Sequence, residues 1–196
     1  QKAQSDKTPF RWQNQMIEGS AGVQGDMEEW RQSFPGNIGA LLDLAKERYP
    51  HRDGVGTPDQ MFTFEACHDK VCRLAHGLKK MGLTRHDRVI ISSSDPFGYA
   101  AFSLAAFRIG AVGVPVNPRM GPYELAHIVK DTSPRLFICN RDSLPGALKA
   151  FELNQGMTPP ALLTLDQKSA SFPSIRGLDV SRADTRIEEM AREDIA

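Results

Sequence analysis

The pattern of hydrophobic and polar residues along this chain predicts a succession of strands and helices. The clearest pattern opens with the β-branched apolar run at residues 89–91 and continues with an almost wholly apolar stretch at residues 97–109. A second short apolar run, residues 112–116, follows it. A strand, a helix and a second strand within roughly thirty residues form a βαβ unit, so we expect the two strands to be parallel.

Local signals set the ends of the central helix. Asp95-Pro96 is typical of an N-cap followed by proline at the first helical position. Gly110 suits the far end, because glycine adopts the left-handed conformation past a helix at no steric cost. A helix that is apolar on nearly all sides must be covered on more than one face.

The succession of predicted helices and strands continues through the rest of the chain. Apolar residues recur at three- and four-residue steps over residues 63–81, which predicts an amphipathic helix. The other predicted elements are a hairpin within residues 53–63, strands at 136–139 and 161–165, a loop at 169–177, and helices at 37–49, 121–131, 143–153 and 181–192. The prediction is an α/β fold, a doubly wound and mainly parallel sheet with flanking helices over residues 37–196, preceded by an N-terminal arm over residues 1–36.

Composition and charge narrow the class of protein. The 196 residues include 24 basic and 24 acidic side chains, so no electrostatic footprint for nucleic acid is visible. The longest apolar stretches are too short for a membrane span, and we expect no signal peptide. Cys67, Cys72 and Cys139 lack the spacing of paired motifs, which is typical of reduced thiols. We therefore expect a globular, cytoplasmic protein.

Two groups of residues could bind a metal ion or an anion, and for each group a purely structural role is the alternative. His68, Cys72 and His76 share one helical stripe, but a single helix supplies too few zinc ligands, and buried His and Cys beside a core are common. The run Ser92-Ser93-Ser94 precedes a helix N-terminus, where anions can bind, yet it lacks the glycines of a phosphate loop. Hydroxyls that cap the helix are the favoured interpretation. With no nucleophile motif such as G-x-S-x-G present, the sequence predicts no catalytic residue and no metal site.

Arg119 is the candidate binding residue. It follows a predicted parallel strand at its carboxyl end, where open α/β sheets bind ligands, and its guanidinium suits phosphate. The alternative is a surface arginine paired with Glu124 or Asp95. Both interpretations stand at the level of sequence.

The segment Phe107-Arg108-Ile109-Gly110-Ala111-Val112-Gly113-Val114-Pro115-Val116-Asn117-Pro118-Arg119 resembles a region near the N-terminus of the adenylate-forming acyl- and aryl-CoA synthetases. That superfamily also includes luciferases and the adenylation domains of nonribosomal peptide synthesis. Shorter pieces fit it in the same order and at similar spacing, at residues 74–78, 82–83, 87–89 and 124–128. The resemblance covers residues 37–139, and we expect it to continue to Ala196.

This resemblance implies an AMP-forming ligase. Such an enzyme activates a carboxylic acid, fatty or aryl, with ATP and Mg²⁺ to an acyl-adenylate and then transfers the acyl group to CoA. The resemblance also implies that Arg119 contacts a CoA phosphate. The family's phosphate loop and catalytic lysine lie beyond the point corresponding to residues 193–196. We therefore expect an incomplete AMP-binding domain, cut before its catalytic motifs, inactive alone and without bound ATP, Mg²⁺ or CoA.

Two other functions stay open from the sequence. The parent protein could load a carrier protein instead of CoA, or the chain could be a non-catalytic α/β binding module. In the family other subdomains cover part of this layer. We therefore expect exposed apolar surface and self-association of the chain.

Overall fold

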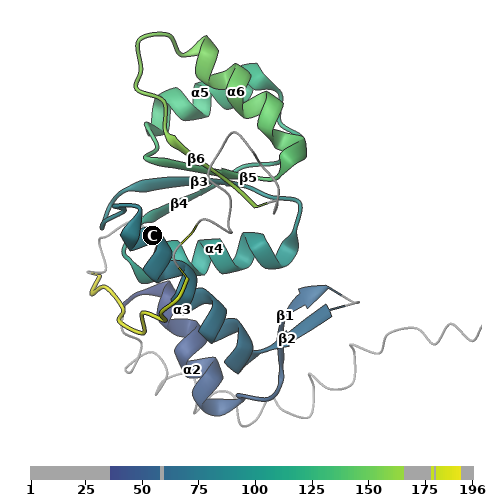
Figure 1. Ribbon diagram of the computed structural model, residues 1–196, viewed down its shortest axis with the longest axis vertical. Helices are drawn as coiled ribbons and strands as arrows, with labels where there is room; N and C mark the ends of the chain where they lie inside the picture. Colours follow the sequence, from purple (N-terminus) through teal and green to yellow (C-terminus); the bar gives the residue numbers. More distant parts are fainter. Residues whose placement is uncertain (1–35, 58–59, 166–177, 179, 191–196) are drawn as a thin grey trace, which may run out of the picture. The chain divides into compact units, whose positions relative to one another are not determined.

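Four parallel strands form the central sheet of the computed structural model, which describes residues 36–57, 60–165, 178 and 180–190 (Figure 1). Their order across the sheet is β4-β3-β5-β6. Ile90 lies beside Val114 on one neighbouring strand and beside Phe137 on the other. The bounds are β3 (Arg88–Ser92), β4 (Val112–Pro115), β5 (Leu136–Cys139) and β6 (Ala161–Thr164).

Helices cover both faces of this sheet. One face carries α4 (Pro96–Arg108), and the other carries α5 (Pro122–Thr132) and α6 (Leu144–Leu153) (Figure 1). Val89 and Ile91 belong to the core on the α4 side, whereas Ile90 belongs to the core with residues of α5 and α6. Successive strand residues point to opposite faces, so a β3 that is buried on both sides is apolar at every central position. The predicted doubly wound, parallel α/β fold is confirmed.

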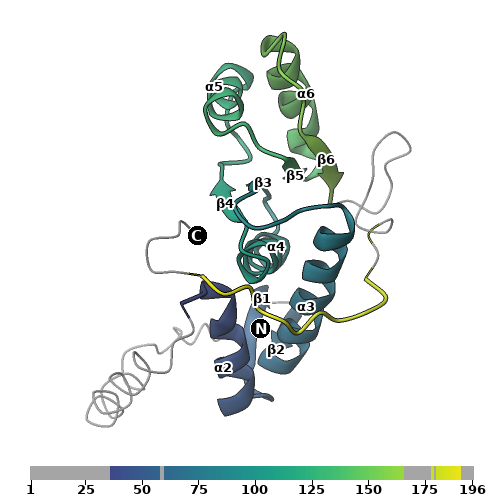
Figure 2. The ribbon, with the colours of Figure 1, turned by 90° about the vertical axis from the view of Figure 1, so that its left-hand side faces the viewer.

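A second layer lies against the far side of α4, which places that helix between the sheet and the layer (Figure 2). The layer explains why α4 is apolar almost all round: Ala101, Phe102 and Ala105 are all buried in one core. The elements of this layer are η1 (Ile38–Ala40), α2 (Leu41–Arg48), α3 (Phe64–Lys80) and the antiparallel hairpin of β1 (Asp53–Thr57) and β2 (Gln60–Thr63).

Capping residues fix the helix starts. The Asp95 carboxylate accepts hydrogen bonds from the N–H groups of Phe97 (3.1 Å) and Gly98 (3.0 Å), and Pro96 follows it. Thr63 caps α3 in the same manner, with its hydroxyl 3.2 Å from the Ala66 nitrogen. These groups satisfy backbone donors that have no partner within the helix, so the predicted helix starts are confirmed.

The predicted helix over residues 181–192 is wrong for its described part. Residues 180–190, called the strap below, form no helix. The N–H of Asp184 donates to the Cys72 carbonyl (3.1 Å), and the N–H of Glu188 donates to the Arg108 carbonyl (2.9 Å). Backbone groups that bond to other elements cannot form the repeating bonds of a helix. The predicted loop at residues 169–177 and the predicted arm at residues 1–36, except for Gly36, lie outside the described residues.

Candidate functional site at the carboxyl edge of the sheet

Three loops meet at the carboxyl edge of the sheet. They follow β3 (residues 93–95), β4 (residues 117–119) and β5 (residues 140–143). The β3 loop leads to α4 on one face, while both neighbouring loops lead to helices on the other face. Open α/β sheets bind ligands where adjacent connections diverge in this way. The carboxyl edge is therefore the candidate site.

Hydrogen bonds join the three loops to one another. The side-chain oxygen of Asn140 accepts the N–H of Ser94 at 2.9 Å, which ties the β5 loop to the β3 loop. The Ser143 hydroxyl donates to the carbonyl of Pro118 at 3.2 Å, which ties the same β5 loop to the β4 loop. Each bond links residues that are far apart in the sequence, so the sheet sets the geometry of the edge.

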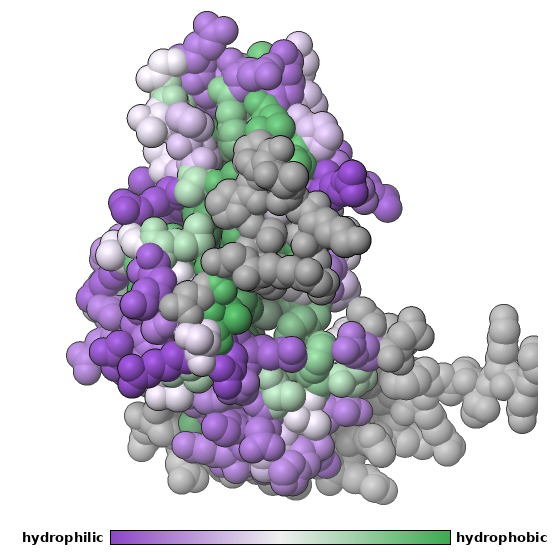
Figure 3. All heavy atoms as spheres, viewed as in Figure 1, coloured by the Kyte–Doolittle hydropathy of each residue, from purple (hydrophilic) through white to green (hydrophobic). Residues whose placement is uncertain are grey.

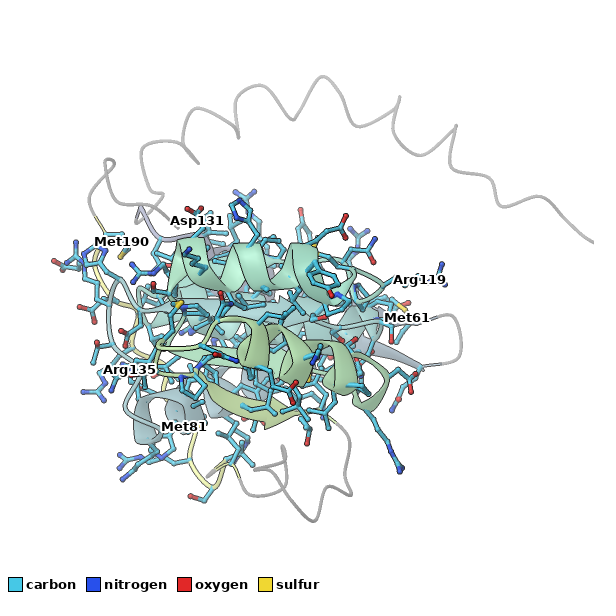
Figure 4. All side chains as sticks on the ribbon, turned by 90° about the horizontal axis from the view of Figure 1, so that it is seen from above. Met61, Met81, Arg119, Asp131, Arg135 and Met190 are labelled. Atoms are coloured by element: carbon cyan, nitrogen blue, oxygen red, sulfur yellow. The ribbon has the colours of Figure 1, made fainter. Side chains whose placement is uncertain are left out.

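Arg119 lies on the outer rim of this edge. Its N–H donates to the side-chain oxygen of Asn117 (2.9 Å), which closes a tight turn of the kind that asparagine favours. The residue is exposed, and Figure 4 shows its side chain pointing away from the sheet. Among the described residues its guanidinium makes no ion pair within 4.0 Å. The Glu124 carboxylate accepts the Gly121 N–H instead. The alternative pairing with Glu124 or Asp95 is therefore not formed in this structure.

The serine run before α4 serves the helix cap. The Ser93 hydroxyl lies 3.0 Å from the Asp95 nitrogen, and Asp95 in turn occupies the helix N-terminus. A carboxylate in this position already satisfies the N–H groups that an anion would use, and it would repel a second negative charge. The Asp95 carboxylate therefore caps the helix, and the Ser93 hydroxyl bonds to the backbone of that cap residue. The structure gives no support to phosphate binding at the serines.

A second polar cluster, which the sequence did not predict, lies between α2, α3 and α4. The fully buried Arg108 guanidinium contacts the Asp43 carboxylate and donates to the carbonyls of Gly39 (3.2 Å) and Thr185 (2.8 Å). His68 Nε2 lies 3.0 Å from the second Asp43 oxygen. The cluster therefore holds three helices and the strap together.

The histidine and cysteine stripe on α3 is divided between two environments. His68 Nε2 lies 3.6 Å from the Cys72 sulfur within the Asp43 cluster, whereas His76 lines a polar hollow beside residues 182–186. Within the described ranges no three ligating side chains are placed to hold a metal ion. The three cysteines, all described and buried, form no disulfide.

Hydrogen bonds control the charges of the Asp43 cluster. Burial by itself would raise the pKa of Asp43, but the bonds from His68 and Arg108 outweigh it and lower the pKa. The hydrogen bond to Asp43, assisted by Cys72, raises the pKa of His68 to about 9. At neutral pH the cluster thus holds a histidinium, a carboxylate and a guanidinium. Lys46 Nζ, 3.4 Å from His68 Nδ1, adds positive charge and acts against that protonation.

We expect the free energy of unfolding to fall as the pH rises from about 6.5 to about 9. The pKa of His68 is raised in the folded state. Its protonation therefore contributes fully to the free energy of unfolding below the ordinary pKa of 6.5, and this contribution is lost as the pH rises to about 9. The slope should reach at most ~1.4 kcal/mol per pH unit. Urea unfolding across this range should show the fall in wild type and in His127→Gln, an exposed control. An equal fall in His68→Gln would contradict the assignment.

Comparison with known proteins identifies the fold that carries this site. The sequence pattern described as AMP-binding enzyme matches residues 42–196, well over half of the chain. The chain belongs to the AMP-binding enzyme family. The predicted resemblance to adenylate-forming synthetases is confirmed, and it extends to Ala196 as expected.

Relatives in this family include enzymes of two kinds. The trans-cinnamate:CoA ligase of Petunia hybrida is 26% identical over 149 residues, covering 76% of the chain and 26% of the relative. The fatty acid–[acyl-carrier-protein] ligase ScoC of Streptomyces coeruleorubidus is 36% identical over 123 residues, covering 63% and 23%. The chain therefore spans about a quarter of the length of these relatives.

Solved structures of other proteins share the fold. The luciferase-like enzyme from the nonluminescent Zophobas morio mealworm aligns with a TM-score of 0.72 and 19% identity, covering 79% of this chain and 37% of the other. The petunia relative is named peroxisomal, so the cytoplasmic location of this chain stays a prediction. No helix in the described part of the chain is long and apolar enough to cross a membrane.

Proposed function

We propose that this chain is the N-terminal part of a longer AMP-forming acid–thiol ligase. The observation that carries the proposal is the family match over residues 42–196, in a chain that spans about a quarter of its ligase relatives. The substrate would be a fatty or aryl carboxylic acid. Its carboxylate oxygen would attack the α-phosphorus of ATP and release pyrophosphate, and the thiol of CoA would then displace AMP.

The proposal gives this chain a binding role. Charge that develops on the phosphoryl group needs positive groups placed around it, and Mg²⁺ would supply part of that charge. We assign no Mg²⁺ site to the described residues of this chain, because they gather no set of metal ligands. Arg119 would bind a phosphate of CoA, since its guanidinium is exposed at the carboxyl edge and pairs with no carboxylate among the described residues.

A carrier protein is the second candidate acceptor. The similarity to ScoC, named as a ligase for an acyl carrier protein, favours it. A substitution of Arg119 should distinguish the two acceptors. If Arg119 binds CoA, the substitution should weaken the reaction with free CoA. If the enzyme is specific for a carrier protein, the substitution should leave its reaction with that acceptor unchanged. Both relatives described above are named as ligases, which favours an enzyme over the third possibility considered from sequence, a non-catalytic binding module.

Carboxylate-dependent ATP–pyrophosphate exchange tests the proposed function. The full-length protein should catalyse exchange with a fatty or aryl acid, and then form the CoA thioester. The chain of residues 1–196 alone should give no exchange above a protein-free control. Exchange by the isolated chain would place the chemistry in these residues, and lack of exchange by the full-length protein with all acids tried would contradict a ligase.

Self-association through exposed apolar surface also stays a prediction. The helix from which it was inferred, α4, is largely covered within the chain. Apolar surface remains exposed elsewhere, and Figure 3 shows it in the region of α5 and α6. A hollow of about 550 Å³ runs beside β6, lined in part by Met81, Leu148 and Phe151. Surfaces of this kind are where a partner would bind.

A further inference from the structure

The turn that carries Arg119 (residues 117–119) owes its local conformation to its own hydrogen bonds, whereas its position relative to the β5 loop depends on a residue outside the turn. Within the turn, Asn117 accepts the N–H of Arg119 through its side chain (2.9 Å) and that of Met120 through its carbonyl (3.0 Å). These bonds fix the local conformation of the turn. They do not fix its position relative to the sheet, because both partners belong to the same loop.

Ser143 supplies the tie between this turn and the β5 loop. Its hydroxyl donates to the carbonyl of Pro118, the residue directly before Arg119, at 3.2 Å. Pro118 has no N–H group, so this carbonyl is its only backbone hydrogen-bonding group. Ser143 is 8% exposed, which largely excludes the water that would compete for the bond.

Ser143 is itself held in place through Asn140. The N–H of Ser143 donates to the Asn140 carbonyl at 3.1 Å. Asn140 makes two such bonds: its N–H donates to the carbonyl of Ser92 at the end of β3 (3.3 Å), and its side-chain oxygen accepts the N–H of Ser94 in the β3 loop (2.9 Å). Pro118 is thus anchored through two residues to the central strand of the site.

We propose that Ser143 is a positioning residue that sets the Arg119 turn for binding a phosphate of CoA. The inference rests on the proposed function of Arg119. A guanidinium–phosphate contact is directional and often bidentate, so a displaced turn weakens it. A turn that is already fixed before binding also loses less conformational entropy when the phosphate binds. Adenylation does not involve CoA, so it should not depend on this hydroxyl.

Ser143→Ala in the full-length ligase tests the proposal. The KM for CoA should rise about 3- to 10-fold, as expected for one lost neutral hydrogen bond, while ATP–pyrophosphate exchange stays at the wild-type rate. Ser143→Thr retains a hydroxyl and should recover most of the CoA affinity. The matched control is Ser103→Ala, which removes a hydroxyl bond to the Tyr99 carbonyl (2.8 Å) inside α4 and should leave the KM unchanged.

Combining Ser143→Ala with Arg119→Ala separates this inference from the proposed function. If Ser143 acts through Arg119, it should add no further rise in KM once Arg119 is alanine. A full additional rise would overturn the inference, and so would a joint loss of exchange activity and melting temperature in Ser143→Ala, which marks a purely structural residue. If Arg119→Ala raises the KM and Ser143→Ala does not, the inference alone fails. If Arg119→Ala has no effect, the proposed CoA contact fails.

Discussion

Replacing Arg119 with alanine in the full-length ligase is expected to raise the KM for CoA by about 10- to 150-fold. A charge-assisted bond to phosphate contributes about 1.5–3 kcal/mol, and Arg119 is exposed at the carboxyl edge with no carboxylate partner among the described residues. ATP–pyrophosphate exchange should remain near wild type. Arg119→Lys should recover only part of the affinity, because the compact ammonium group of lysine cannot make the two parallel hydrogen bonds of a planar guanidinium. Steady-state kinetics of both half-reactions measure this split.

An arginine at the opposite edge of the sheet supplies the control. Arg135 directly precedes β5 at its amino end and is also exposed (Figure 4). Arg135→Ala removes the same charge from the protein and should leave the KM for CoA unchanged. Equal rises in the KM for CoA in the two variants would show that the overall positive charge of the protein, and not a direct contact of Arg119, favours CoA binding. Unchanged kinetics in Arg119→Ala, together with acylation of a carrier protein, would favour the carrier protein as acceptor.

Replacing Asp43 with alanine is expected to lower the free energy of unfolding by about 3 kcal/mol. The change leaves the fully buried Arg108 guanidinium without its carboxylate and removes the partner of His68. The Asp43 side chain is 27% exposed, which places the expected loss at the lower end of the range for buried pairs. The melting temperature should fall by roughly 6–12 °C in thermal unfolding.

An exposed aspartate on α3 provides the comparison for Asp43. Asp69 pairs with Arg73 at 2.8 Å, and both side chains are substantially exposed. Pairs of this kind contribute little to stability, so Asp69→Ala should leave the melting temperature nearly unchanged. A small shift for Asp43→Ala, no larger than that for Asp69→Ala, would show that Arg108 finds other partners or water in its place.

The Asp43 cluster shows what sequence patterns could not predict. Asp43, His68 and Arg108 lie on three different helices, and no local spacing relates them. Arg108 is the last residue of a nearly apolar helix and has the ordinary signature of a C-terminal basic residue. Its burial arises because η1, α2 and the strap pack over that helix end and present the carbonyls of Gly39 and Thr185 to it.

The strap was mispredicted for the same reason. Its charged residues favour a solvated helix when only neighbours in the sequence are considered. In the fold, Lys79 binds Asp184 (3.0 Å) and Arg73 binds the carbonyls of Val180 and Ser181 (both 3.2 Å). Such contacts with distant residues replace the bonds of a helix, and local propensity is too weak to oppose them.

The sequence by itself determined the parallel strands, the helices within residues 37–153 and the turn that presents Arg119. Each depends on signals within a few residues: alternating apolar positions, the Asp95-Pro96 cap, and the Asn117 turn. Tertiary structure alone decided that Asp43 neutralises a buried Arg108, that the strap forms no helix, and that Ser143 holds Pro118. These features join groups at least 25 residues apart, and only the packing of layers brings such groups within hydrogen-bond distance.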